Sequence, residues 1–195
     1  MFFEEENEEK NENAKGSEAL LGKLLETRQI ILSGEVNKAL AEKVVNQLLI
    51  LDAASDEPIY VYIDSPGGDV DSGYAIFDMM RFVKSPVITV GMGLVASAGA
   101  LIFLASPKER RIALPNSHYL IHQPLSGMKG VATDIEIHAQ ELEKAKEKIN
   151  LLISEETGVK LEQVKKDTER DYWMNAQEAL EYGLAGKIVS KRSEL

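Results

Sequence analysis

Residues 87–124 read VITVGMGLVASAGALIFLASPKERRIALPNSHYLIHQP, and this stretch decides the fold. It begins with the short β-branched run 87–90, which is typical of a buried strand. Gly91 and Gly93 then allow a sharp turn. Residues 98–105 are small and apolar, which predicts a buried helix. Ser97 is therefore expected at the first turn of that helix.

Ser97 has the surroundings that a catalytic nucleophile needs. The first turn of a helix carries free backbone N–H groups and a partial positive charge. Such groups stabilise the oxyanion that forms when a serine attacks a carbonyl. The neighbours Ala96, Ala98 and Gly99 are small and leave room for a substrate. The simpler interpretation is that Ser97 only caps the helix, as serines before helices commonly do.

A serine nucleophile needs a base, and histidine is the usual one. The chain has three histidines, at positions 118, 122 and 138. His118 and His122 lie an even number of residues apart on either side of a predicted strand over residues 119–121, so they would share a face. Their spacing does not decide which of them is the base. His138 falls on the narrow apolar seam of a predicted helix over residues 131–156, which favours a structural role.

The same stretch admits three other interpretations. Residues 86–105 carry no charge and are long enough to span a membrane, although a strand followed by a buried helix explains the same apolarity. Residues 91–96, GMGLVA, form a loose dinucleotide-binding fingerprint, but the acidic partner at the expected distance, Glu109, precedes the next apolar run. Val95 stands where a Gly-x-Ser-x-Gly elbow has its first glycine, which disfavours an α/β-hydrolase.

The composition of the chain argues against several classes of function. A chain of 195 residues can form one sizeable core. Its 32 acidic and 22 basic residues give a formal charge of −10, which argues against a nucleic-acid binder. The absence of cysteine excludes disulfides and thiolate chemistry and permits a cytoplasmic location. No metal-ligand spacing or phosphate-binding loop appears in the sequence, so no metal or other cofactor is expected.

The N-terminus is rich in glutamate, with six of them among residues 4–12. A secretory signal would instead have a basic start and an apolar centre. The pattern predicts a mobile acidic tail over residues 1–16 and one domain over residues 17–195.

Strand and helix patterns alternate along the chain, which is typical of an α/β protein. Further strands are predicted at residues 29–32, 59–63, 112–114 and 188–190. Further helices are predicted at residues 20–26, 37–51, 71–83, 161–166 and 175–182. Residues 123–130 contain Pro124, Gly127 and Gly130, which predict an exposed loop or hairpin arm.

Gly67 and Gly68 directly follow the strand predicted over residues 59–63. Two glycines between a strand and a helix let the backbone approach a ligand closely. The Gly68 N–H is therefore a candidate oxyanion donor, although an ordinary strand-to-helix turn explains the same residues.

Five stretches together resemble the Clp protease family, the proteolytic subunits of ATP-dependent serine peptidases. They are YVYIDSPGG at 60–68, GLVASAG at 93–99, LPNSHYLIHQP at 114–124, ATDIEIH at 132–138 and DTERD at 167–171. The resemblance covers residues 28–190 and implies an α/β fold, a crotonase-like ββα spiral with a protruding handle helix. The handle would occupy residues 123–156.

The resemblance also implies roles for individual residues. Ser97 would be the nucleophile, His122 the general base and Asp171 the carboxylate that orients the base, a convergent version of the Ser-His-Asp triad. The backbone N–H groups of Gly68 and Ala98 would form the oxyanion hole.

Three further groups of residues match positions that the family uses for binding. Those implied to contact the substrate are Gly67, Val70 and Leu125. Those implied in contacts between rings are Glu169 and Arg170. Those implied to dock an unfolding ATPase are Tyr60, Tyr62 and Phe82.

Family members assemble as two stacked heptameric rings around a chamber. The resemblance thus implies a cytoplasmic serine endopeptidase that cuts unfolded polypeptides to short peptides through an acyl-enzyme. Its partners would be a Clp-type AAA+ unfoldase and other copies of the chain, with neither nucleic acid nor a membrane, and it would need no cofactor.

Two departures from the family pattern suggest a divergent second subunit that works beside a paralogue. The acidic tail replaces the usual axial-gate segment, and His118 stands where an arginine is common. Two alternatives remain: a catalytically silent or partner-dependent ring subunit, and a crotonase-type acyl-CoA enzyme, which would need no Ser97–His122 pair.

Overall fold

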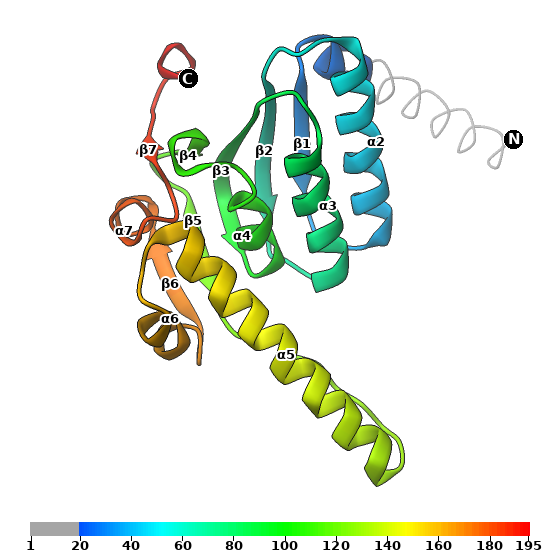
Figure 1. Cartoon of the computed structure of the whole chain (residues 1–195). Coiled ribbons are helices and arrows are strands. Elements are labelled where there is room, and N and C mark those ends of the chain that lie inside the picture. Colours follow the sequence, from blue (N-terminus) through cyan, green and yellow to red (C-terminus); the bar gives the residue numbers. More distant parts are fainter. Residues whose placement is uncertain (1–19) are drawn as a thin grey trace, which may run out of the picture.

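In the described part of the chain, residues 20–195, seven strands form one sheet in a computed structural model (Figure 1). The strands are β1 (Gln29–Ser33), β2 (Ile59–Ser65), β3 (Val87–Ala96), β4 (Arg111–Ala113), β5 (His118–Ile121), β6 (Tyr172–Asn175) and β7 (Lys187–Ile188). The labelled helices are α2 (Lys38–Ala54), α3 (Val70–Phe82), α4 (Ala98–Phe103), α5 (Ala132–Thr157), α6 (Leu161–Asp167) and α7 (Ala176–Tyr182). Residues 20–26 are also helical, as predicted, and 3₁₀ turns cover Lys108–Arg110 and Arg192–Glu194. The expected boundary between residues 16 and 17 lies outside the described residues.

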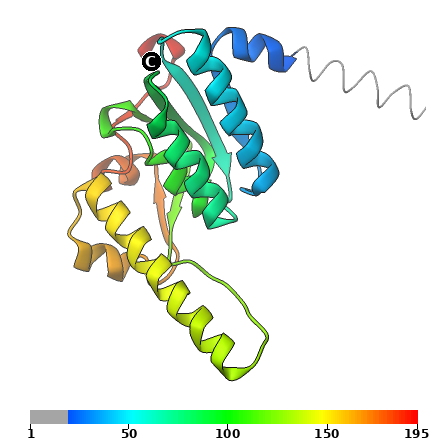
Figure 2. The same cartoon turned by 45° about the vertical axis from the view of Figure 1, so that its right-hand side comes forward.

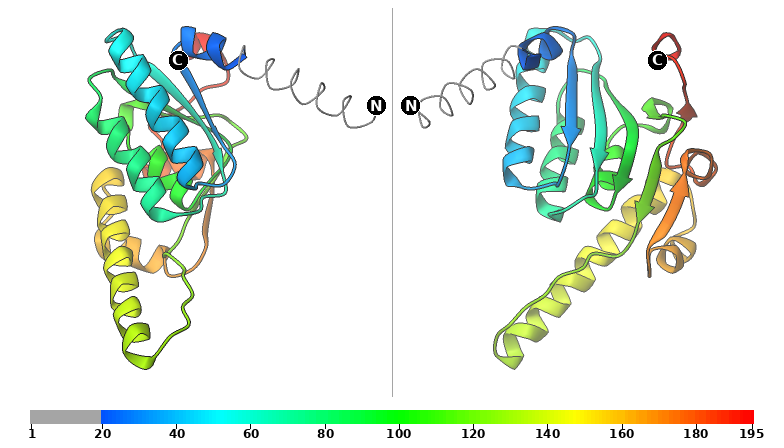
Figure 3. Two further views of the ribbon diagram at one scale, coloured as in Figure 1. Left: turned by 90° about the vertical axis from the view of Figure 1, so that its right-hand side faces the viewer. Right: turned by 180° about the vertical axis from the view of Figure 1, so that it is seen from behind.

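The sheet is mostly parallel, in the order β1-β2-β3-β4-β7, with β5 beside β3. Parallel neighbours need crossover connections, and α2 and α3 provide them on one face of the sheet (Figure 3). Ile59, Val61 and Ile63 of β2 are buried, whereas the alternate Tyr60 and Tyr62 are half-buried on the opposite face. The predicted α/β class is therefore confirmed.

Strand β3 is longer than predicted because it runs through both of its glycines. A Cβ at Gly91 would lie 2.3 Å from the Tyr119 Oη, so this glycine makes room for a buried tyrosine. A Cβ at Gly93 would lie 2.6 Å from the Asp64 Oδ1, which accepts a hydrogen bond from the Leu94 N–H. The expected turn at these glycines is wrong.

The course of β3 contradicts two other interpretations of residues 86–105, a membrane span and a dinucleotide-binding turn. Residues 86–105 form a strand and the six-residue helix α4 rather than a membrane span. Within residues 20–195, no helix has both the length and the apolarity needed to cross a bilayer. Residues 91–96 belong to β3, so they cannot form the strand-to-helix turn of a dinucleotide site.

The long helix α5 projects from the body of the molecule (Figures 1 and 2). It ends at Gly158, which adopts a left-handed conformation with φ 80°, as expected for a C-cap glycine. The loop that precedes α5 lies beside the helix (Figure 2). The His138 Nε2 of the helix lies 2.9 Å from the Ser126 Oγ of that loop. Along the predicted apolar seam, Ile149 is buried and Leu152 is half-buried, whereas Ile135 is exposed in the single chain. The protruding helix is therefore confirmed, with a free N-terminal half in this chain.

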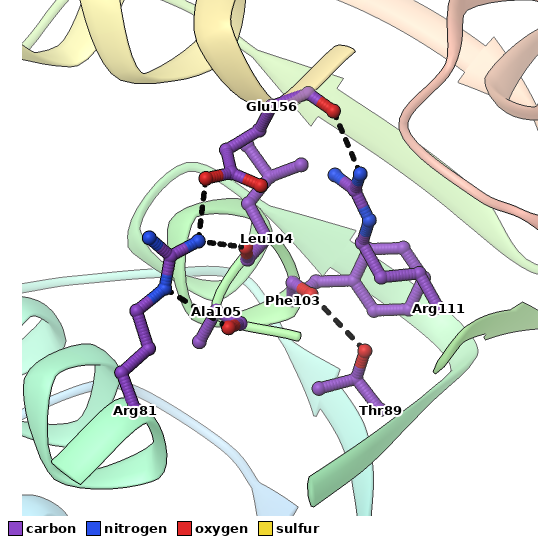
Figure 4. A network of polar contacts seen from close by, with 7 residues as sticks. All are labelled: Arg81, Thr89, Phe103, Leu104, Ala105, Arg111 and Glu156. Atoms are coloured by element: carbon purple, nitrogen blue, oxygen red, sulfur yellow. Dashed lines mark hydrogen bonds and ion pairs between the residues drawn. The ribbon is translucent and has the colours of Figure 1, made fainter. Parts of the chain in front are cut away.

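A polar network anchors the C-terminal end of α5 to the body (Figure 4). Arg81 of α3 forms an ion pair with Glu156 and donates to the backbone carbonyls of Leu104 and Ala105. Arg111, which is buried, donates from Nη2 to the Glu156 backbone carbonyl at 2.7 Å. Burial lowers the pKa of the Arg111 guanidinium, and the Glu156 carboxylate opposes that shift. Glu156 thus joins α5 to α3 and β4.

We expect Glu156→Gln to lower the free energy of unfolding by about 1–2 kcal/mol, because the buried Arg111 loses its main countercharge. The effect is smaller than for a fully buried pair because Arg81 is partly exposed. Urea denaturation of the full chain measures it. Glu155→Gln removes the same charge from an exposed position one residue earlier and should change stability by less than about 0.5 kcal/mol. Equal midpoints for the two variants would contradict this role of Glu156.

Candidate active site

Strand pairing places Ser97 at the end of β3, beside β5. Leu94 of β3 lies opposite His118 of β5, and Ala96 lies opposite Leu120. The pairing continues one residue further, because the Ser97 N–H donates to the Leu120 carbonyl at 2.9 Å. The serine backbone is therefore held against the strand that ends next to His122.

Strand β6 then brings Asp171 to His122. The two strands are antiparallel, and Ile121 of β5 lies opposite Tyr172 of β6. Beyond this pair, His122 directly follows β5 and Asp171 directly precedes β6. The two residues therefore lie opposite one another. The sequence pattern predicts no strand here, because residues 167–173 read as a dense charged run that includes the only tryptophan. The signal that could have found β6 is Tyr172-Trp173-Met174, two aromatic strand formers followed by an apolar residue.

The imidazole of His122 bridges a hydroxyl and a carboxylate. Its Nε2 lies 2.9 Å from the Ser97 Oγ, and its Nδ1 lies 3.0 Å from the Asp171 Oδ1. His118 lies on an exposed position at the other end of β5, opposite Asn175. The structure therefore brings His122 to Ser97, a choice that spacing alone left open.

Ser97 adopts a backbone conformation that non-glycine residues rarely visit, with φ 54° and ψ −121°. Strain of this kind is concentrated at functional sites. Ser97 is the N-cap residue of α4, one position before the predicted first turn, and its side chain makes no capping hydrogen bond. The interpretation of Ser97 as a plain helix cap is therefore wrong, since its hydroxyl is directed to His122.

The loop that contains Gly67 and Gly68 packs directly against Ser97. A Cβ at Gly67, where φ is +90°, would lie 2.6 Å from the Ser97 Cβ and 2.9 Å from the Ala98 nitrogen. Val36 bridges this loop by accepting from the Asp69 N–H and donating to the Gly67 carbonyl, both at 2.8 Å. Among the described residues, neither the Gly68 N–H nor the Ala98 N–H has a hydrogen-bond partner. Two free donors thus flank the serine on neighbouring segments.

One hollow lies at the serine, and a second shares two lining residues with the first. Ser97 and His122 line a narrow one of about 20 Å³ whose walls include Val70, Ile149 and Ile153. A wider groove of about 540 Å³ shares Val70 and Pro124 with it and is also lined by Gly68 and Leu125. All three residues expected to contact substrate, Gly67, Val70 and Leu125, therefore border the serine or the groove beside it.

The turn that carries Asp171 is held in part by Thr168 and Asn150, to which the sequence analysis assigns no role. Thr168 is buried, and its hydroxyl donates to the Asn150 Oδ1 of α5 at 2.6 Å. No local pattern predicts this pair, because Asn150 lies inside a long helix and Thr168 inside a charged run. Glu169 accepts a hydrogen bond from the Lys146 ammonium at 3.0 Å, which lowers the pKa of Glu169. Arg170 is exposed.

The residues expected to dock an ATPase are only partly brought together. Tyr60 and Tyr62 pack on the same small cluster of Val90, Ile112 and Val189. Tyr62 also lines a hollow of about 270 Å³ beside Leu114 and Leu195, and burial raises its pKa. Phe82, at the end of α3, is 78% exposed and does not line this hollow in the single chain.

Within residues 20–195, no group of three or more histidine and acidic side chains is arranged to hold a metal ion. The groups gathered at the described site are a hydroxyl, an imidazole, a carboxylate and backbone N–H donors.

Comparisons with known proteins agree on one family. The family model described as Clp protease matches residues 11–192. The chain is 62% identical over 195 residues to the ATP-dependent Clp protease proteolytic subunit 2 of Treponema denticola, covering 100% of this chain and 98% of that protein. It is 47% identical over 195 residues to the ATP-dependent Clp protease proteolytic subunit 3 of Rhizobium etli, covering 100% of both. A solved mutant of ClpP1 from Listeria monocytogenes has a TM-score of 0.84 and 46% identity, over 89% of this chain and 98% of that one.

We expect Gly67→Ala to slow the reaction of Ser97 with a fluorophosphonate about 100-fold, because the new methyl group would displace the serine. The rate of mass increase of the intact protein measures this reaction. Gly34→Ala is the matched control: Gly34 has nearly the same backbone angle, φ +88°, but open space around its Cβ position. Its labelling rate should stay close to that of the unmodified protein. Equal rates for the two variants would contradict the close packing of this loop on Ser97.

Proposed function

This chain belongs to the Clp protease family, and from that premise we propose that it is a serine endopeptidase subunit of a self-compartmentalised, ATP-dependent protease. The observation that carries the proposal is the His122 imidazole, 2.9 Å from the Ser97 Oγ and 3.0 Å from the Asp171 Oδ1. A nucleophile within hydrogen-bond reach of a base, which a third group orients, is the arrangement of nucleophilic catalysis.

The mechanism follows from this geometry. The Ser97 Oγ attacks the carbonyl carbon of the scissile peptide while the His122 Nε2 takes the hydroxyl proton. Asp171 holds the Nδ1–H of the imidazole and stabilises the imidazolium that forms. The free N–H groups of Gly68 and Ala98 stabilise the oxyanion. His122 then gives its proton to the leaving amine, and water activated by His122 hydrolyses the acyl-enzyme.

The substrate we propose is an unfolded polypeptide that is cut into short peptides. The wide groove beside Ser97, bordered by Val70 and Leu125, has room for an extended chain. Residues 123–130 form an irregular loop along this groove. Its backbone groups would pair with the substrate as an added strand, so binding would depend little on substrate sequence.

The assembly we propose is two stacked heptameric rings in the cytoplasm. Apolar side chains remain exposed on the free half of α5, which favours burial against another subunit. They are Val131, Ile135 and Ile137. Glu169 and Arg170 would make contacts between rings. An AAA+ unfoldase would dock at Tyr60, Tyr62 and Phe82.

A second, paralogous proteolytic subunit is a further proposed partner. The relatives are named as numbered subunits, 2 and 3, which fits a protein that is one of several. His118 and the acidic N-terminus, which depart from the family pattern, also support this proposal.

We expect Ser97→Ala to lower hydrolysis of a fluorogenic peptide by more than about 1000-fold, because no other group replaces the nucleophile. Ser193→Ala, at an exposed position outside the site, is the control and should retain full activity. Retained cleavage by Ser97→Ala would contradict the proposal. Cleavage that appears only after a paralogous subunit is added would favour the partner-dependent alternative. Activity on an acyl-CoA that persists in Ser97→Ala would favour the crotonase-type alternative.

We expect Tyr62→Ala to abolish ATP-driven degradation of a folded substrate while unassisted peptide hydrolysis stays within about twofold. The reason is that Tyr62 lines the apolar hollow proposed to receive the unfoldase and lies on a different face of the sheet from the core helices. Parallel assays with and without the unfoldase measure both activities. Equal loss of both, or of neither, would contradict docking at this hollow.

A further inference from the structure

The carboxylate of Asp171 is more exposed, and makes fewer contacts, than is usual for the orienting member of a Ser-His-Asp site. Its side chain is 61% exposed, and His122 is its one hydrogen-bond partner among the described residues. Orienting aspartates are normally buried and fixed by their surroundings. The position of this carboxylate must therefore be set by the backbone of the turn over residues 168–171.

Gln123 holds that turn through two hydrogen bonds. Its backbone N–H donates to the Thr168 carbonyl at 2.7 Å. Its side-chain Nε2 donates to the Glu169 carbonyl, also at 2.7 Å. Because Gln123 directly follows His122 in the chain, one residue connects the base to the turn that carries the carboxylate.

These hydrogen bonds lie on one side of the His122–Asp171 contact, and the β5–β6 ladder lies on the other. On one side, the last pair of the β5–β6 ladder is Ile121 opposite Tyr172. On the other side are the two bonds from Gln123. The imidazole and the carboxylate are thus held between two backbone attachments, which keeps them opposite one another although neither is deeply buried.

Of the side chains that hold this turn, Gln123 is the one that binds the Glu169 backbone, two residues before Asp171. The Thr168–Asn150 bond fixes the start of the turn, three residues before the carboxylate. The Lys146–Glu169 ion pair involves a largely exposed carboxylate, and such pairs contribute little. We propose that Gln123 is a positioning residue that keeps Asp171 in contact with His122, an inference that rests on the proposed function.

The test measures peptide hydrolysis by the assembled full-length protein, with native mass as the check of assembly. Gln123→Ala should lower kcat about tenfold with KM unchanged, because the base is less well oriented while the groove is intact. Gln123→Glu has the same shape but cannot donate to the Glu169 carbonyl, so it should lose a similar factor. Lys165→Gln, which removes a positive charge from an exposed position of α6 outside this turn, is the control and should stay within about twofold.

A double mutant separates positioning from general structural damage. If Gln123 acts through Asp171, Gln123→Ala should have no further effect in an Asp171→Asn background. Because that background is slow, the rate of Ser97 modification by excess fluorophosphonate is followed there by mass. An undiminished loss in the double mutant, or a Gln123→Ala variant as active as the unmodified protein, would overturn the inference.

Failure of the proposed function gives a different result. In that case the unmodified protein shows no Ser97-dependent hydrolysis, whereas failure of the inference leaves that activity in place. If Gln123→Ala does not assemble, the Gln123→Glu variant decides the question by the same two criteria.

Discussion

The register of β5 between β3 and β6 is the constraint on which the site depends. One edge of β5 pairs in parallel with β3, and the other edge pairs antiparallel with β6. A shift of one residue in either ladder would turn side chains to the opposite face of the sheet. In the observed register, Ser97 directly follows β3, His122 directly follows β5 and Asp171 directly precedes β6. All three residues therefore lie at the same end of these neighbouring strands. Three residues that are distant in sequence thereby become neighbours through backbone hydrogen bonds.

Packing around β3 holds Ser97 in its strained conformation. Such a backbone costs roughly 1–3 kcal/mol and persists only where the surroundings enforce it. All six residues of α4 are buried next to the serine, and a Cβ at Gly67 would lie 2.6 Å from the Ser97 Cβ. On another side, Ile149 and Ile153 of α5 form a wall of the hollow at the serine. The anchoring of α5 through Glu156 therefore bears on the site as well as on the projecting helix.

The alternation of strands and helices was predictable because it follows from local apolar periodicity, and so was the candidate nucleophile. Asn37 and Asn175 show how local this information is, since both stand where the pattern begins a helix and both cap that helix in the structure. The choice between His118 and His122 was not available from spacing, because residues four apart would share a face of a regular strand. Only resemblance to a known family identified His122 and Asp171 beforehand. The spacing function of Gly91 and the Thr168–Asn150 pair depend on contacts between distant segments, which no local pattern encodes.

The catalytic role proposed for Ser97, His122 and Asp171 is tested most directly by the crystal structure of the protein after reaction with a phosphonate ester. We expect a single adduct on the Ser97 Oγ, with its oxygen within hydrogen-bond distance of the Gly68 and Ala98 N–H groups. The His122 imidazole should lie between the adduct and the Asp171 carboxylate. An adduct on another residue, or His122 turned away from both Ser97 and Asp171, would contradict the catalytic role assigned to this register.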